Sequence, residues 1–160
     1  MGQQQLLLVI LVTILVGIAT VVALNVFGTA AESGNRDAVR QDLIQGASAA
    51  QAIWARPRAL GGVQGVFNDV ATVPNADFGR LVGIPGSVDG LVITNENAVY
   101  TVARTGADIL TISAVPVTYG ENMSIRIERL DEPVAGSSWW VQLTDDGATA
   151  PIDLSGADPD

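Results

Sequence analysis

The sequence contains no cysteine, no histidine and no lysine, and its eight basic residues are all arginine. Without cysteine there is neither a disulfide framework nor a thiolate metal site. Without histidine the commonest ligand of transition metals is missing, and without histidine or lysine the chain lacks the usual base of a catalytic triad. We therefore expect no cofactor and no metal, and we expect that the protein is not an enzyme.

Carboxylate chemistry is the alternative that this composition leaves open. The acidic pairs at 131–132 and 145–146 lie in predicted turns, where aspartate is common because it hydrogen-bonds nearby backbone. No catalytic spacing connects them. Residues 144–147, together with Asp153, offer oxygen ligands beside a glycine but do not match the calcium loop of an EF-hand. We interpret them as solvated acidic turns.

Positive charge is scarce. The chain has 17 acidic and 8 basic residues, a net charge of −9, and its arginines are scattered from Arg36 to Arg129. A nucleic-acid surface needs clustered cations to neutralise phosphates, so we expect no nucleic-acid partner. An acidic exterior favours solubility and mutual repulsion of the water-facing part.

Charged side chains are absent from residues 1–31, and residues 6–27 form a predominantly apolar run. At about 1.5 Å per residue this run makes a helix of about 33 Å, enough to cross the roughly 30 Å hydrocarbon core of a bilayer. The segment can therefore span a membrane or be buried in an equally dry environment.

Three interpretations of this segment compete. A secretory signal peptide has a positively charged start and a shorter apolar region, although Thr29-Ala30-Ala31 resembles a cleavage site. A single-pass membrane anchor explains the run by its length alone. The third interpretation is a helix that packs closely against other helices, because small residues recur through its middle. These small residues are Gly17, Ala19, Thr20 and Ala23.

Helical periodicity continues beyond the apolar run. After a weak joint at Gly28 and residues 33–34, an amphipathic helix is predicted over residues 35–56, with Asn35 as its N-cap and Pro57 as its stop. Its apolar stripe should lie on a sheet. The stripe consists of Val39, Leu43, Gly46, Ala50 and Ile53, with Trp54 beside it.

The rest of the chain changes character twice. Residues 57–90 are rich in glycine and proline and predict an ordered connecting loop with one or two short strands at most. From residue 91 the apolar period becomes two, which predicts strands up to about residue 144. The side chains expected to face the helix include Ile125, Ile127, Trp139 and Val141. Residues 145–160 predict a loosely held acidic tail.

The expected fold class is therefore α+β. A long N-terminal helix, apolar in its front half and amphipathic in its back half, should pack on an antiparallel meander of four or five strands. The expected domains are an apolar membrane or filament-core helix at 1–31 and, at 32–160, the helix continuation with a β-rich domain.

This architecture resembles the type IV pilins and the related pseudopilins. The resemblance rests on a short leader ending in Gly2, a polar start at Gln3, Gln4 and Gln5, the unbroken apolar helix, its amphipathic continuation and the β-rich remainder. It implies that a prepilin peptidase cuts after Gly2 and that Gln3 becomes the first, often methylated, residue of the mature subunit. Family members typically carry glutamate at the fifth mature position, which is Leu7 here.

The resemblance further implies a structural protein. The apolar helix would first anchor the subunit in the inner membrane and then pack with copies of itself in the core of a helical surface filament, built by a pilus assembly machinery. The residues carried over to this filament core are Leu6, Leu7, Ile10, Ile14, Gly17, Val21 and Leu24. The alternatives are a single-pass membrane-tethered β-rich binding domain and a minor pseudopilin of a secretion system.

Overall fold

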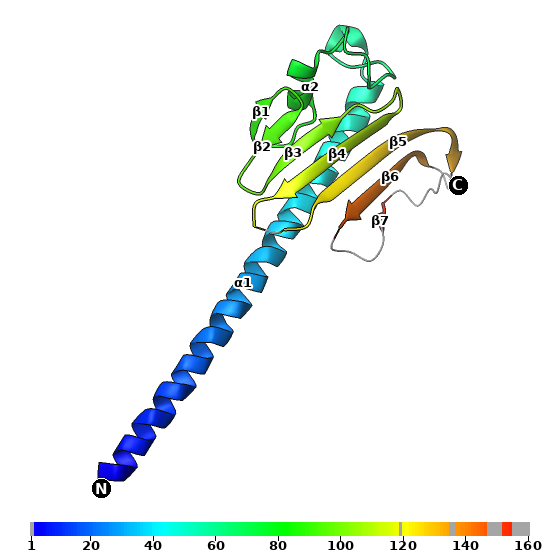
Figure 1. Cartoon of the computed structure of the whole chain (residues 1–160). Coiled ribbons are helices and arrows are strands. Elements are labelled where there is room, and N and C mark those ends of the chain that lie inside the picture. Colours follow the sequence, from blue (N-terminus) through cyan, green and yellow to red (C-terminus); the bar gives the residue numbers. More distant parts are fainter. Residues whose placement is uncertain (1, 119, 135–136, 147–151, 155–160) are drawn as a thin grey trace. The chain divides into compact units, whose positions relative to one another are not determined.

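The computed structural model describes residues 2–118, 120–134, 137–146 and 152–154 and confirms the α+β class (Figure 1). The chain divides into two compact units, Met1–Gly34 and Asn35–Asp160. The helices are α1 (Gly2–Ala55), the short 3₁₀ helix η1 (Arg58–Leu60) and α2 (Asn75–Leu81). The strands are β1 (Ser87–Asp89), β2 (Val92–Thr94), β3 (Ala98–Ala103), β4 (Ile109–Pro116), β5 (Met123–Val134), β6 (Ser137–Asp145) and β7 (Ile152–Asp153).

Helix α1 is continuous where a joint was predicted. It passes through Gly28 and Gly34 without interruption and ends at Ala55, two residues before Pro57. A single glycine costs a helix only about 1 kcal/mol relative to alanine, and no proline breaks the segment. The prediction that Asn35 caps a second helix is wrong. Its side-chain amide instead donates to the backbone oxygen of Asn97 at 3.0 Å.

The strands form one antiparallel sheet in the order β1-β2-β3-β4-β5-β6-β7, a simple meander. Five of them, β2 to β6, correspond to the strands predicted after residue 90. Strand β1, of three residues, lies in the region where one or two short strands were predicted, whereas β7, of two residues, was not predicted. Residues 152–153 pair with β6 and are not a loose tail, whereas 147–151 and 155–160 lie outside the described residues.

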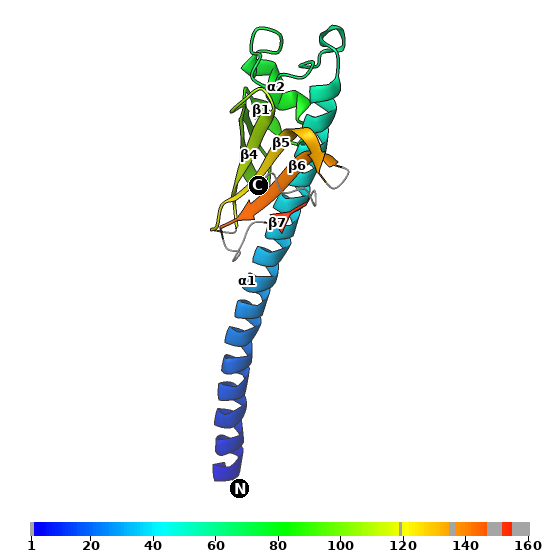
Figure 2. The same cartoon turned by 90° about the vertical axis from the view of Figure 1, so that its right-hand side faces the viewer.

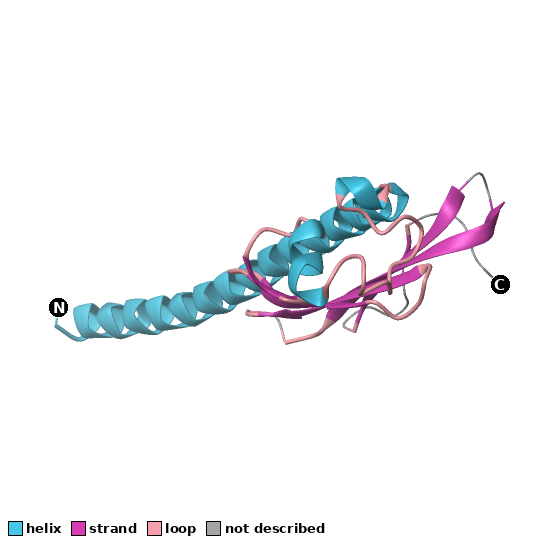
Figure 3. Cartoon of the chain, turned by 90° about the horizontal axis from the view of Figure 1, so that it is seen from above, coloured by secondary structure: helices cyan, strands magenta, loops and turns pink. Residues whose placement is uncertain are grey.

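The second half of α1 covers one face of this sheet, as Figures 2 and 3 show. The predicted stripe is buried, with Val39, Leu43 and Ala50 at 0% exposure. Alternate residues of the strands meet it; they include Tyr100, Ile112, Ile125, Ile127 and Leu143. Gly46 lies where α1 packs tightly on the sheet, since a Cβ there would stand 2.9 Å from Ile112 Cδ1.

Two tryptophans close the end of this core where α1 stops. The rings of Trp54 and Trp139 meet edge to face with centroids 5.2 Å apart, and the guanidinium of Arg129 lies over both rings. Val141, the remaining predicted packing residue, is 9% exposed. The side chains predicted to join helix and sheet therefore all lie in the core or against it.

The region at 57–90 contains helical turns that were not predicted. They are η1 and helix α2, and β1 is the one short strand that the structure describes there, within the one or two predicted. Phe78 of α2 is fully buried, and Gly79 lies against the backbone of Gly90, where a Cβ would come within 2.2 Å of the carbonyl oxygen. Close approach of two backbones explains the glycine at this position.

Arg104 holds this region against the sheet. Its guanidinium donates to the backbone oxygens of Phe67 and Val73, the latter at 2.8 Å, and to Asn75 Oδ1 at 3.0 Å. It also lies 4.3 Å above the ring centroid of Phe78. Burial lowers the pKa of Arg104, although its charge is kept at any ordinary pH.

Candidate functional site

The first unit presents an apolar surface that is exposed along residues 6–27. Between residues 6 and 27 the large apolar side chains are 47–72% exposed. The residues assigned above to a filament core, Leu6, Leu7, Ile10, Ile14, Gly17, Val21 and Leu24, all lie on this surface. The helix is long and apolar enough to cross a membrane, with a mean hydropathy of 3.1 over its most apolar window.

The two residues at which the pilin resemblance implies leader cleavage lie at the beginning of the same helix. Gly2 is the first residue of α1, and both Gly2 and Gln3 are exposed. A Cβ added at Gly2 or at Gly17 would meet no atom of the described residues within 4 Å. Packing among those residues therefore requires neither glycine.

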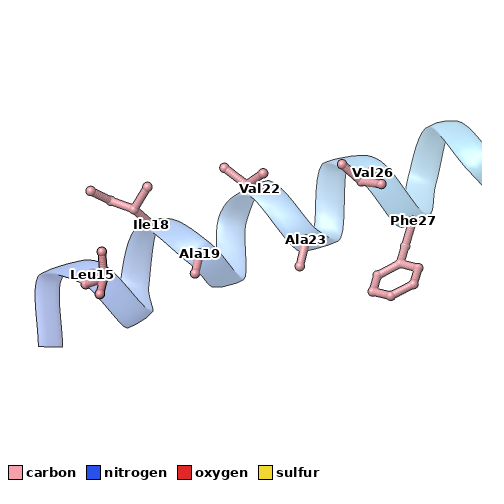
Figure 4. Close-up of a pocket in the computed structure, with 7 residues that line it drawn as sticks. All are labelled: Leu15, Ile18, Ala19, Val22, Ala23, Val26 and Phe27. Atoms are coloured by element: carbon pink, nitrogen blue, oxygen red, sulfur yellow. The ribbon is translucent and has the colours of Figure 1, made fainter. Parts of the chain in front are cut away.

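Small side chains give one side of the apolar surface a shallow depression. Ala19 and Ala23 are one turn apart, and larger residues flank them (Figure 4). The residues around the two alanines are Leu15, Ile18, Val22, Val26 and Phe27. A depression formed by small side chains lets the backbone of another helix approach closely.

Three of the polar side chains in the apolar segment are satisfied by their own helix. Thr13 and Thr20 donate to the carbonyl oxygens of Val9 and Val16, each at 2.8 Å. Thr29 makes the same kind of bond to the preceding turn. A threonine bonded in this way adds little polarity to a dry environment.

The second unit holds a buried carboxylate, Asp42, on the face of α1 that meets the sheet. Its Oδ2 accepts hydrogen bonds from the Tyr100 hydroxyl at 2.6 Å and from the side-chain amides of Asn95 and Asn97 at 3.1 and 3.2 Å. Burial, followed by the adjacent carboxylate, raises the pKa of Tyr100. The cluster fixes the β2–β3 hairpin to the helix.

A second buried carboxylate, Asp145, ties the end of β6 to α1. Its Oδ2 accepts from Arg36 Nε at 2.6 Å and from Arg40 Nη2 at 3.0 Å. The Asp145 side chain is 0% exposed, whereas the arginines retain 26% and 31%. Asp145 was predicted to begin a loose tail, and that prediction is wrong for this residue.

The outer face of the sheet, away from α1, carries Trp140. Its ring lies under the guanidinium of Arg126 at 5.5 Å, and Arg126 also pairs with Glu128 at 2.7 Å. Within the described ranges no three acidic side chains come together as a metal site would require. The polar contacts of the second unit thus hold its elements together, and the uncovered apolar surface is the candidate functional site.

Comparison of the chain with models of protein families, with curated proteins and with solved structures found no match. The apolar helix followed by an antiparallel sheet is nevertheless compatible with a pilin-like architecture. The candidate surface was predicted from the sequence, because the uncharged and predominantly apolar composition of residues 6–27 is enough to identify it. Sequence reasoning missed Asp42 and Asp145, whose partners are 53 to 109 residues away in the chain.

Proposed function

We propose that the protein is a structural subunit of an extracellular filament of the type IV pilus class. In this filament, copies of the chain pack through residues 6–27, and the acidic second unit faces the medium. The observation that supports the proposal best is the uncovered apolar surface on a helix that continues without a break into a folded unit.

The physical driving force is burial of that surface. Each Å² of apolar surface removed from water contributes about 25 cal/mol of free energy, so burial of a twenty-residue apolar helix contributes tens of kcal/mol before opposing terms are counted. Ordering and immobilising each subunit offsets part of this gain. Contacts that repeat head to tail without closing produce a filament, not a ring.

The proposal includes a path to the filament. The subunit begins in the inner membrane, which the length of the apolar helix permits. A prepilin peptidase cuts between Gly2 and Gln3, the new N-terminus is methylated, and an assembly machinery moves the subunit into the growing fibre. Loss of Met1 and Gly2 is therefore expected in the intact mass of the mature chain.

The deciding experiment is electron microscopy of material sheared from cells that make the protein. Thin filaments labelled by an antibody against the second unit are expected. If the chain stays in the membrane and no filament contains it, a single-pass tether with a β-rich binding domain replaces the proposal. Scarce labelling, confined to a few points of filaments made of another protein, identifies a minor pseudopilin.

A matched pair of substitutions tests the surface itself. Ile14→Glu places a charge on the apolar segment, where the native side chain is 56% exposed, and filaments should be lost. Val70→Glu makes the same change at a side chain of the second unit that is 53% exposed, and filaments should remain. Filaments formed equally well by both variants contradict packing through residues 6–27.

A further inference from the structure

Two places in the first unit carry side-chain amides that have no hydrogen-bond partner among the described residues. The side-chain amides of Asn25 and Gln5 belong to exposed residues and make no hydrogen bond to any residue that the structure describes. The threonines between and beside them are bonded to their own helix. Asn25 and the glutamines at 3–5 are therefore the polar side chains of this unit, up to residue 31, that need an outside partner in a dry environment.

The spacing of Gln5 and Asn25 suits a membrane span. Twenty residues of helix separate them, about 30 Å at 1.5 Å per residue, which equals the thickness of a hydrocarbon core. In a single copy spanning a bilayer, each amide reaches one of the two interfaces, where water and headgroups can bond it. Once the subunit leaves the bilayer for a water-free core, those partners are lost, and each unpaired amide costs about 1–3 kcal/mol.

We propose that in the filament the Asn25 amide of one copy hydrogen-bonds the Gln5 amide of a neighbouring copy, so that the pair fixes an axial offset of about 30 Å between parallel helices. This inference rests on the proposed function. A side-chain amide has both a donor and an acceptor, so the two groups complement each other. A single buried asparagine is known to set register between packed helices in this way.

The angular positions of the two residues fit an open assembly. Twenty residues at about 100° each place Gln5 about 200° around the helix from Asn25, on nearly the opposite face. A copy can therefore offer Asn25 to one neighbour and Gln5 to another. Repetition of such a head-to-tail contact continues indefinitely, as a filament requires.

Thiol cross-linking tests the pairing, and the absence of native cysteine makes the assay specific. Two chains of different tag length, one carrying Gln5→Cys and the other Asn25→Cys, are co-expressed with an excess of the wild-type chain, which keeps the filaments in register, and sheared filaments are treated with a short bifunctional thiol cross-linker. The expected product is a mixed dimer; a linker is used because two paired amide side chains hold their Cα atoms farther apart than the roughly 4.4–6.8 Å that a direct disulfide requires. The control pairs Thr13→Cys with Asn25→Cys and should leave the chains monomeric.

A second measurement determines the axial offset between neighbouring helices in the filament. In image reconstructions of wild-type filaments, an integer multiple of the helical rise should equal about 30 Å. Asn25→Leu should abolish ordered filaments or broaden the distribution of this offset. The double variant Gln5→Asn with Asn25→Gln should restore ordered filaments with the wild-type offset. Thr20→Val should leave the offset unchanged.

Each outcome decides a different point. A mixed dimer together with loss of order in Asn25→Leu supports the pairing. Ordered filaments in which the mixed dimer does not form, or in which Asn25→Leu keeps the wild-type offset, overturn the pairing but not the proposed function. If wild-type cells make no filament of this chain, the proposed function fails and the pairing fails with it.

Discussion

Asp145→Asn is the substitution whose effect on the folded unit can be worked out most fully. The change keeps the shape of the side chain and removes its charge. Arg36 and Arg40 then lose the negative charge of a shared acceptor that now lies 2.6 and 3.0 Å from them, and two cations remain side by side. Removing one partner of a fully buried pair costs about 3–5 kcal/mol.

The expected loss is smaller than that range because the arginines are not fully buried. With 26% and 31% exposure they recover part of their hydration when the carboxylate is gone. We therefore expect the free energy of unfolding to fall by about 2–3 kcal/mol. For a unit of roughly 125 residues this corresponds to a decrease in Tm of about 8–11 °C.

Thermal unfolding of the full chain in detergent micelles, followed by tryptophan fluorescence, measures this loss. The three tryptophans all lie in the second unit, so the signal reports on that unit. Asp37→Asn is the matched control, because Asp37 also approaches Arg40, at 3.7 Å, but has a 72% exposed side chain. Its effect should stay below about 1 kcal/mol. Equal Tm values for the two variants would refute the reasoning about burial.

Three further predictions concern the second unit. Tyr100→Phe removes a donor from Asp42 and should cost about 1.5–3 kcal/mol by urea unfolding. Folding raises the pKa of Tyr100 above its value in the unfolded chain, which is about 10. The protonated Tyr100 hydroxyl therefore stabilises the fold fully below that pH, and this stabilisation is lost progressively as the pH rises above it. The variant lacks the hydroxyl, so its free energy of unfolding should fall less than that of the wild type between about pH 9 and 11. Gly46→Val should cost about 1–3 kcal/mol in the same assay, because Ile112 leaves no room. Arg104→Ala should open residues 58–75 to limited proteolysis, since that side chain holds their backbone; an unchanged digestion pattern contradicts the role.

The parts of the fold that could be predicted are those with a regular apolar period. Val39 and Leu43 recur at helical spacing and Ile125 and Ile127 at strand spacing, and all four are buried in the core. A repeated apolar period is a local property of the sequence, so it can be recognised without knowing which residues the side chains contact. The apolar segment was predictable for the same reason, since its composition alone marks it as dry.

The parts that could not be predicted depend on contacts between distant residues. Helix α2 has seven residues, one of them a glycine, and is too short to be stable by its own propensity. Burial of Phe78 and the backbone contact at Gly79 stabilise it. Asp145 likewise has the sequence environment of a turn, and only the return of β6 toward α1 places it beside Arg36, 109 residues away.

The two units differ in how their polar groups are satisfied. In the second unit, Asp42 and Asp145 find donors on other elements of the same chain, so these buried carboxylates need no outside partner. In the first unit the threonines use their own helix, but Asn25 and Gln5 have no partner among the described residues. An apolar surface can be buried against lipid or against any apolar protein surface, whereas an unpaired amide requires a hydrogen-bond donor or acceptor at a particular position. In the proposed filament, the direction and offset of assembly should therefore depend on these few polar side chains and not on the apolar residues that surround them.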